Sequence, residues 1–210
     1  MVEIAVVSLA TFFATIGPID VAAMFAALTG TASSHARQAM ARRGTLIAAV
    51  ILFAFALLGE TLLAAFGISL AALRTAGGIL LLLIGIEMVF ARPSGATSAT
   101  SEETHEAEAK NDISVFPLAT PLIAGPGAIG ASILLMADVQ GDVVGQLVVL
   151  SSLTVILFFT YLALLGATRL MRLLGVTGMR VISRVFGVLL CGLAVQFIFD
   201  GIRQSGLLTG

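Results

Sequence analysis

The sequence is poor in the residues from which enzymes and metal sites are built. Cys191 is the only cysteine, so no internal disulfide and no cysteine-based metal site can form. Both histidines, His35 and His105, fall in predicted loops, and there is no phosphate-binding glycine loop or nucleophile elbow. The net charge of −1, without a basic patch, gives no sign of nucleic-acid binding. We therefore expect no enzyme, cofactor site, metal site or nucleic-acid interface.

Charge is scarce and apolar residues are abundant. Only 11% of the residues are charged, 59% are hydrophobic and the mean hydropathy is +1.10, as in a multi-pass membrane protein. The N-terminal segment lacks the basic start of a signal peptide, so we keep it as the first span. Apolar runs of about 20 residues predict an all-α protein with six membrane spans. The predicted spans are 4–29, 45–66, 69–91, 113–137, 144–168 and 183–202.

A hydrophilic linker divides the single transmembrane domain. Residues 92–112 are rich in Ser, Thr, Ala and Glu, and such a composition buries too little apolar surface to fold alone. The linker leaves three spans in residues 1–91 and three in residues 113–210.

The basic residues predict the topology. Nine of the eleven Lys and Arg residues follow spans one, three and five. These are Arg37, Arg42, Arg43, Arg92, Lys110, Arg169, Arg172, Arg180 and Arg184. The positive-inside rule therefore places those loops, including the linker, in the cytoplasm and both termini outside it.

Proline and glycine interrupt the fourth span. Residues 116–130 read FPLATPLIAGPGAIG, and Pro126 has no amide hydrogen and clashes with the preceding turn, so it breaks the helix. The neighbouring Gly125 and Gly127 tolerate backbone angles that are closed to other residues. A broken helix in a membrane exposes polar backbone groups, which is tolerated where they are buried in protein or line a cavity. Gly17-Pro18 is the matching pair in the first span.

The two halves also repeat each other. Gly125 follows Gly17 by 108 residues, and Arg184-Val-Phe-Gly187 follows Arg74-Thr-Ala-Gly77 by 110. Because each half holds three spans, the second half enters the membrane inverted. Inverted repeats with broken helices in matching positions are typical of secondary transporters. The alternative is an old duplication retained for packing, in which both Gly-Pro pairs are plain kinks.

The breaks predict an anion site near the middle of the membrane. Proline suits the first turn of a helix, so Pro18 and Pro126 are expected to start half-helices that run to about Thr29 and Ala137. Each start presents free amides and a partial positive charge, which suit a carboxylate. The predicted substrate-binding residues are Gly17, Pro18, Asp20, Gly125, Pro126 and Gly127.

Ionisable and polar residues inside spans are candidates for coupling to a proton or cation. Asp20 lies in the first turn after Pro18, where it either binds a coupling ion or caps free amides. Glu87 and Gln196 match within one position of the repeat register, which predicts that both face the shared interior. Glu60 is expected to reach outward to solvent.

The motifs resemble a known family. FPLATPLIAGPGAI, VFGVLLCGLAVQFIFDGI and GPIDVAAMFAALT resemble signatures of the MarC-related integral membrane proteins, and the similarity covers essentially the whole chain. This family is grouped with the LysE-like exporters and is related to the SnatA neutral amino acid transporters. The resemblance implies an inner-membrane location and a small neutral amino acid, such as glycine or alanine, as substrate. The first motif departs from the family pattern. The family usually has other residues at the positions that hold Gly17, Asp20, Val21 and Ala23 in this sequence.

We therefore predict a secondary transporter of small neutral amino acids, embedded in the lipid bilayer, with two inverted three-helix repeats and broken first and fourth helices. A homo-oligomer is compatible with this prediction. Two alternatives remain open. One is an ion or metal transporter that uses Asp20, Glu60, Glu87 and Gln196 as oxygen ligands. The other is a non-transporting membrane protein that acts through partners.

Overall fold

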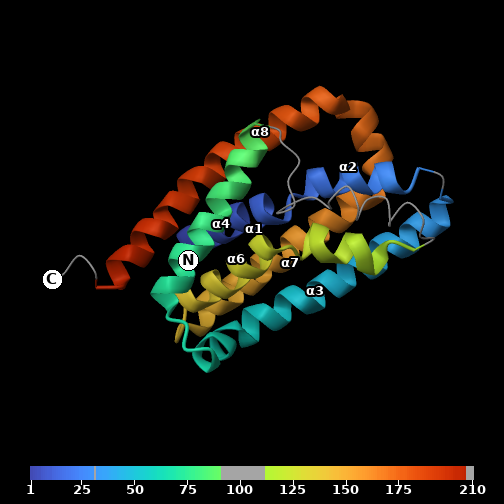
Figure 1. The fold of residues 1–210 in the computed structure, drawn as a ribbon. Helices are drawn as coiled ribbons and strands as arrows, with labels where there is room; N and C mark the ends of the chain where they lie inside the picture. The colour runs from blue at the N-terminus through green and yellow to red at the C-terminus, as the bar shows by residue number, and fades with distance from the viewer. Residues whose placement is uncertain (31, 91–111, 207–210) are drawn as a thin grey trace.

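The computed structural model describes residues 1–30, 32–90 and 112–206, which form helices joined by short connections (Figure 1). The helices are α1 (Val2–Ile16), α2 (Pro18–Leu28), α3 (Ser34–Ala65), α4 (Leu70–Phe90), η1 (Ser114–Ile123), α6 (Pro126–Asp138), α7 (Val143–Leu165) and α8 (Ala167–Gln204). The described part of the chain contains no strand, so the all-α prediction is confirmed. The predicted linker, apart from Asp112, lies outside the described residues.

The six predicted spans correspond to the helices. Among the described residues, five segments are long and apolar enough to cross a membrane, and the bent pair η1 and α6, taken as one span, makes a sixth. The first span combines α1 and α2 over Val2–Leu28, and the last is Val181–Gln204 within α8. Most predicted boundaries agree with the observed ones to within a few residues, but the second span was predicted to begin at residue 45, whereas α3 begins at Ser34.

The first break is made by a single glycine. Gly17 ends α1 with φ 59° and ψ 58°, a left-handed conformation that side chains disfavour. Pro18 then occupies the first turn of α2, where its missing amide hydrogen costs nothing. The predicted break and the predicted new helix start are both confirmed.

The second break is sharper and has several causes. Phe116 and Thr120 have extended backbone angles inside η1, because each precedes a proline and a proline disfavours the α region before it. Pro126 begins α6, and the bend between η1 and α6 is 55°. Gly125 does not use the wider backbone range that glycine tolerates, since its φ of −80° and ψ of 170° are adopted readily by other residues.

Gly127 is explained by packing instead. A Cβ at this position would lie 2.5 Å from Ile84 Cδ1 in α4, which is well inside contact distance. The absent side chain therefore lets α4 approach the start of α6.

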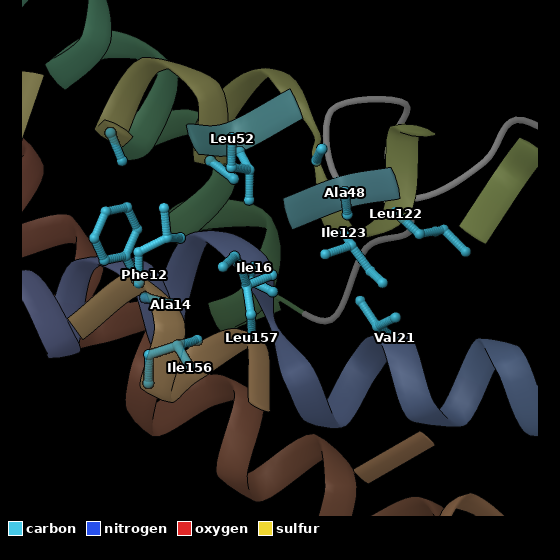
Figure 2. Close-up of a cluster of buried hydrophobic side chains, with 14 of the residues drawn as sticks. Phe12, Ala14, Ile16, Val21, Ala48, Leu52, Leu122, Ile123, Ile156 and Leu157 are labelled. Carbon is cyan, nitrogen blue, oxygen red and sulfur yellow. The ribbon is translucent and has the colours of Figure 1, made fainter. Parts of the chain in front are cut away.

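The helices pack in a regular pattern around one apolar core. α3 packs against η1 and α6, while α7 packs against α1 and α2. Figure 1 shows α3 along one side of the molecule and the α4–α8 pair along the other, with α6 and α7 between them. Both breaks border the core, where Ile16, Ile123 and Leu157 are buried in one cluster (Figure 2).

Glycines bring the backbones of α4 and α8 together. A Cβ at Gly78 would lie 2.8 Å from the carbonyl oxygen of Ala194, and one at Gly85 would lie 3.0 Å from that of Gly187. At the other end of the seam, a Cβ at Gly201 would lie 2.8 Å from the amide nitrogen of Thr75. These contacts pair the two helices antiparallel. Small residues provide this kind of close packing in membranes, where lipid gives no hydrophobic drive for helix association.

Candidate functional site

A pocket lies beside the first break, between α1, α2, α4 and α8. It is a shallow, open pocket with a cavity volume of about 10 Å³, roughly the space of one water molecule. The residues that line it are Phe13, Gly17, Ile19, Asp20, Met88, Ile182, Ser183 and Phe186. The lining is mostly apolar with one carboxylate and one hydroxyl, a composition typical of small-ligand sites.

Asp20 and Ser183 supply the polar side of this pocket. The Ser183 hydroxyl in α8 donates a hydrogen bond of 2.6 Å to Asp20 Oδ1 in α2. Asp20 lines the pocket and is an exposed residue. A carboxylate within a membrane span is costly unless it is paired or reaches water, which marks Asp20 as a functional candidate.

The Asp20 carboxylate also lies close to the break itself. A Cβ at Gly17 would be 3.6 Å from Asp20 Oδ2, which places the negative charge beside the N-terminus of α2. This position is favoured by the helix dipole. The side chain nevertheless makes no capping hydrogen bond at α2, so the predicted capping alternative is not observed. A second anion at this helix start would be repelled by Asp20.

The start of α6 has a different environment. It carries no carboxylate in its first turn and no side-chain cap, and Gly125 and Gly127 are buried. By helix geometry the first amides of α6 have no partner within the helix. Gly127 faces Thr15 of α1 and Ile84 of α4. Neither Thr15 nor Ile84 is among the residues that line the pocket.

The other predicted coupling residues lie apart from this pocket. Gln196 is exposed and its Nε2 donates to both carboxylate oxygens of Asp200 at 3.1 Å, so its predicted place in the shared interior is wrong. Glu87 is half-buried in α4 and adjoins the pocket residue Met88, although it is not itself among the lining residues. Glu60 is exposed, as predicted, and accepts a hydrogen bond from Gln140.

Polar contacts at one end of the bundle join segments predicted to be cytoplasmic. Arg37 at the start of α3 donates to Thr168 at the start of α8. Arg43 forms an ion pair of 3.2 Å with Asp112. Hydrogen bonds from the hydroxyl (2.5 Å) and backbone amide (2.9 Å) of Ser114 hold the pKa of Asp112 below its usual range, and Arg43 lowers it further.

The opposite end of the bundle contains a buried ion pair. Arg74 in α4 is only 7% exposed and pairs through Nη2 with Oδ1 of Asp138, the last residue of α6. Thus contacts at each end join residues that the charge distribution predicts to share a membrane face.

Sequence reasoning missed Ser183 and Asp138 as partners. Ser183 belongs to a basic segment at the edge of the predicted sixth span, and nothing local links it to Asp20, 163 residues away. A signal for Asp138 was present, because a cation inside a span requires a partner and Arg74 lies inside the third. Among the described residues, no group of three His, Cys, Asp or Glu side chains is placed to hold a metal ion.

Comparisons with known proteins give the family. The model of MarC family integral membrane proteins matches residues 2–205. A UPF0056 membrane protein of Methanocaldococcus jannaschii is 37% identical over 200 residues, which cover 95% of this chain and 96% of the relative. The UPF0056 membrane protein YvbG of Bacillus subtilis is 35% identical over 92% of this chain and 91% of its own length. YhcE of Escherichia coli, another UPF0056 membrane protein, is 34% identical over 91% of this chain and 88% of its own length.

No solved structure matches the chain. The family model and these relatives span nearly the whole sequence, including both breaks and the pocket between α2 and α8. The chain therefore belongs to the MarC family of integral membrane proteins.

Proposed function

We propose that this multi-pass membrane protein is a secondary transporter of small neutral amino acids. The observation that carries the proposal is the pair of Gly-Pro breaks near the middle of the first and fourth spans. Each starts a new helix with proline, and the first lies beside a pocket that contains a carboxylate. Discontinuous helices of this kind form substrate and ion sites in secondary transporters.

The helix pairing supports an inverted repeat. Exchanging α1 and α2 for η1 and α6, α3 for α7 and α4 for α8 preserves the main packing partners. α3 packs on η1 and α6 as α7 packs on α1 and α2, and α4 packs on α6 as α8 packs on α2. The pairs α3–α7 and α4–α8 map onto themselves, and α4–α8 is antiparallel. A two-fold axis in the membrane plane produces this pattern.

The two breaks suit the two ends of a zwitterion. The amides after Pro126 have no competing carboxylate, so they are assigned to the substrate carboxylate. Asp20 is assigned to the substrate ammonium or to a coupling proton or cation, because its charge repels a carboxylate at the start of α2. The substrate-binding set is then Gly17, Pro18, Asp20, Gly125, Pro126 and Gly127, with Ser183 holding Asp20.

Substrate size is limited by the surroundings of both breaks. Ile84 occupies the space beside Gly127, and Ile16 and Ile123 are almost fully buried. A ligand placed at the α6 amides beside Gly127 would compete with the tip of Ile84 for the same space. Glycine and alanine require the least displacement, which supports a small substrate.

The alternatives receive less support. A cation site built from Asp20, Glu60 and Gln196 would require side chains that instead contact Ser183, Gln140 and Asp200 separately. A non-transporting protein would not need a pocket with a carboxylate at a helix break.

Uptake into proteoliposomes tests the proposal. Labelled glycine and alanine, within a panel of amino acids, are offered with and without imposed proton and sodium gradients. We expect saturable uptake of the smallest members, above that of protein-free vesicles. Absence of uptake and exchange across the whole panel, with well-folded protein, would remove the substrate assignment.

A further inference from the structure

The first part of α8 connects two neighbouring membrane spans. α7 ends at Leu165 and the last span begins at Val181, so the residues between them stay at one membrane surface. The helix is broken within this stretch, because Gly175 has φ 60° and ψ 178°, a conformation that favours glycine. In Figure 1 the start of α8 does not continue along the line of the rest of the helix. Residues 167–184, which include the first turn of the span, are called the elbow below.

The elbow carries charge of one sign. No Asp or Glu occurs in residues 143–199, whereas the elbow contains Arg169, Arg172, Arg180 and Arg184. Arg169 and Arg184 are exposed, and neither forms an ion pair with another described residue. A further cation comes from α3, since Arg37 donates a hydrogen bond to Thr168 in the first turn of the elbow. The elbow therefore presents positive charge that the described part of the protein does not neutralise at Arg169 and Arg184.

Exposed apolar side chains accompany these two arginines. Leu173 is 83% exposed and lies one turn after Arg169, so both are on the same face of the helix. Beyond the break, Val181 is 55% exposed and lies one turn before Arg184. A surface that is both apolar and cationic suits the membrane interface, where apolar groups contact acyl chains and long basic side chains reach the headgroups.

We propose that the elbow is a binding site for the headgroups of anionic phospholipids. Leu173 and Val181 contact the acyl chains, while Arg169 and Arg184 bind headgroup phosphates, which the guanidinium group can do through two parallel hydrogen bonds. Clusters of four or more basic residues next to a span attract anionic lipids in this way. The site adjoins the Asp20 pocket, because Ser183 lines that pocket. The proposal is independent of the transported substrate.

Quenching of a fluorophore by labelled lipids provides the test. In a Cys191→Ala background, Leu173→Cys carries an environment-sensitive fluorophore, and the full chain is reconstituted in phosphatidylcholine vesicles. Spin-labelled phosphatidylglycerol or spin-labelled phosphatidylcholine is then added, and the ratio of their quenching gives the preference for the anionic headgroup. The double variant Arg169→Gln with Arg184→Gln removes the two charges, and the corresponding double lysine variant keeps them. The matched control is Arg203→Gln, which removes an exposed arginine at the other end of α8.

We expect the parental protein to prefer phosphatidylglycerol by about fivefold or more, because each arginine near an anionic surface contributes roughly that factor. The double glutamine variant should lose most of this preference. The double lysine variant should keep most of it, and Arg203→Gln should match the parent. High salt should weaken the preference, since exposed charges are screened.

Four results would overturn the proposal. The first is equal quenching by the two lipids in the parental protein. The second is a preference that survives in the double glutamine variant, and the third is a preference lost equally in folded Arg203→Gln. The fourth is displacement of phosphatidylglycerol by inorganic phosphate but not by sodium chloride of equal ionic strength, which would identify a site for soluble phosphate. Retained preference in the double lysine variant shows that any loss with glutamine reflects charge and not misfolding.

Discussion

The two Gly-Pro breaks share a sequence motif but differ in structure. The first is a gentle interruption: Gly17 in a left-handed conformation separates α1 from α2, which together still form one span, and an open pocket lies alongside. The second is a 55° bend with extended residues before two prolines, and Gly127 is packed against Ile84. The first break carries a carboxylate at the new helix start, and the second carries none.

This difference assigns unlike roles to related elements. A helix start with its own carboxylate favours cations, whereas one with free amides favours anions. In the proposed transporter, two inverted halves would thus present both charges to one small zwitterion.

The largest effect is expected at the first break. Replacing Asp20 by Asn should lower amino acid uptake by about 30-fold or more, because truncating a charged partner costs about 2 kcal/mol or more. Ser183→Ala is the matched control, since it removes one neutral donor to Asp20 and leaves the carboxylate. Its expected loss is roughly fivefold, for a hydrogen bond worth about 1 kcal/mol. If Asp20→Asn and Ser183→Ala had equal effects on uptake by folded protein, the charge of Asp20 would not be the important property.

Crowding the second break is expected to affect stability more than chemistry. A methyl group at residue 127 meets Ile84 Cδ1 at 2.5 Å, so Gly127→Ala should lower the free energy of unfolding by about 1–2 kcal/mol. Ile84→Val removes that methyl group, and the double variant should recover most of the loss. Thermal unfolding in detergent is measured for both single variants and the double variant, and it gives the coupling free energy between residues 84 and 127. Additive effects would show that Ile84 does not determine the need for glycine.

Backbone conformation should matter at the first break. Gly17→Ala places a side chain at φ 59° with no close contact, so the expected destabilisation is about 1 kcal/mol from strain alone. Gly130→Ala in α6 is the control, because that position is helical and open. It should stabilise the protein by about 0.5–1 kcal/mol. Equal changes in unfolding temperature would contradict the conformational explanation.

The smallest effect concerns the entrance to the second break. Asp112 accepts hydrogen bonds from Ser114 at the start of η1, and its pKa is lower in the folded protein than in the unfolded chain. Its stabilisation is therefore present above the ordinary Asp pKa of about 4 and disappears as the pH falls through the folded value. Because Asp112 is 48% exposed, Asp112→Asn should cost about 0.5 kcal/mol or less at pH 7. The difference from the parent should vanish in acid, and a constant difference from pH 7 to pH 3 would contradict this reading.

The sequence was sufficient for the parts of the fold that depend on local physics. Apolar runs predicted the spans, proline predicted both helix starts, and the basic loops predicted which segments meet at each end. The sharper second break follows from its additional prolines, which are visible in the sequence, whereas the packing of Gly127 against Ile84 was not predictable because the two residues are distant in sequence. The partners of Asp20 and Arg74 were missed for the same reason. Gln196 was misassigned because the repeat register gives the position of a residue along its helix, but it does not show whether another helix packs over that residue.

Protection of a pocket thiol by substrate tests the central claim most directly, namely that the Asp20 pocket is part of the amino acid site. Met88 lines the pocket from α4 and is not assigned to charge recognition, so Met88→Cys in the Cys191→Ala background reports its occupancy. Saturating glycine or alanine should slow alkylation of this thiol, and Asp20→Asn should abolish the protection. An alkylation rate that is unaffected by any amino acid that the protein transports would contradict the account.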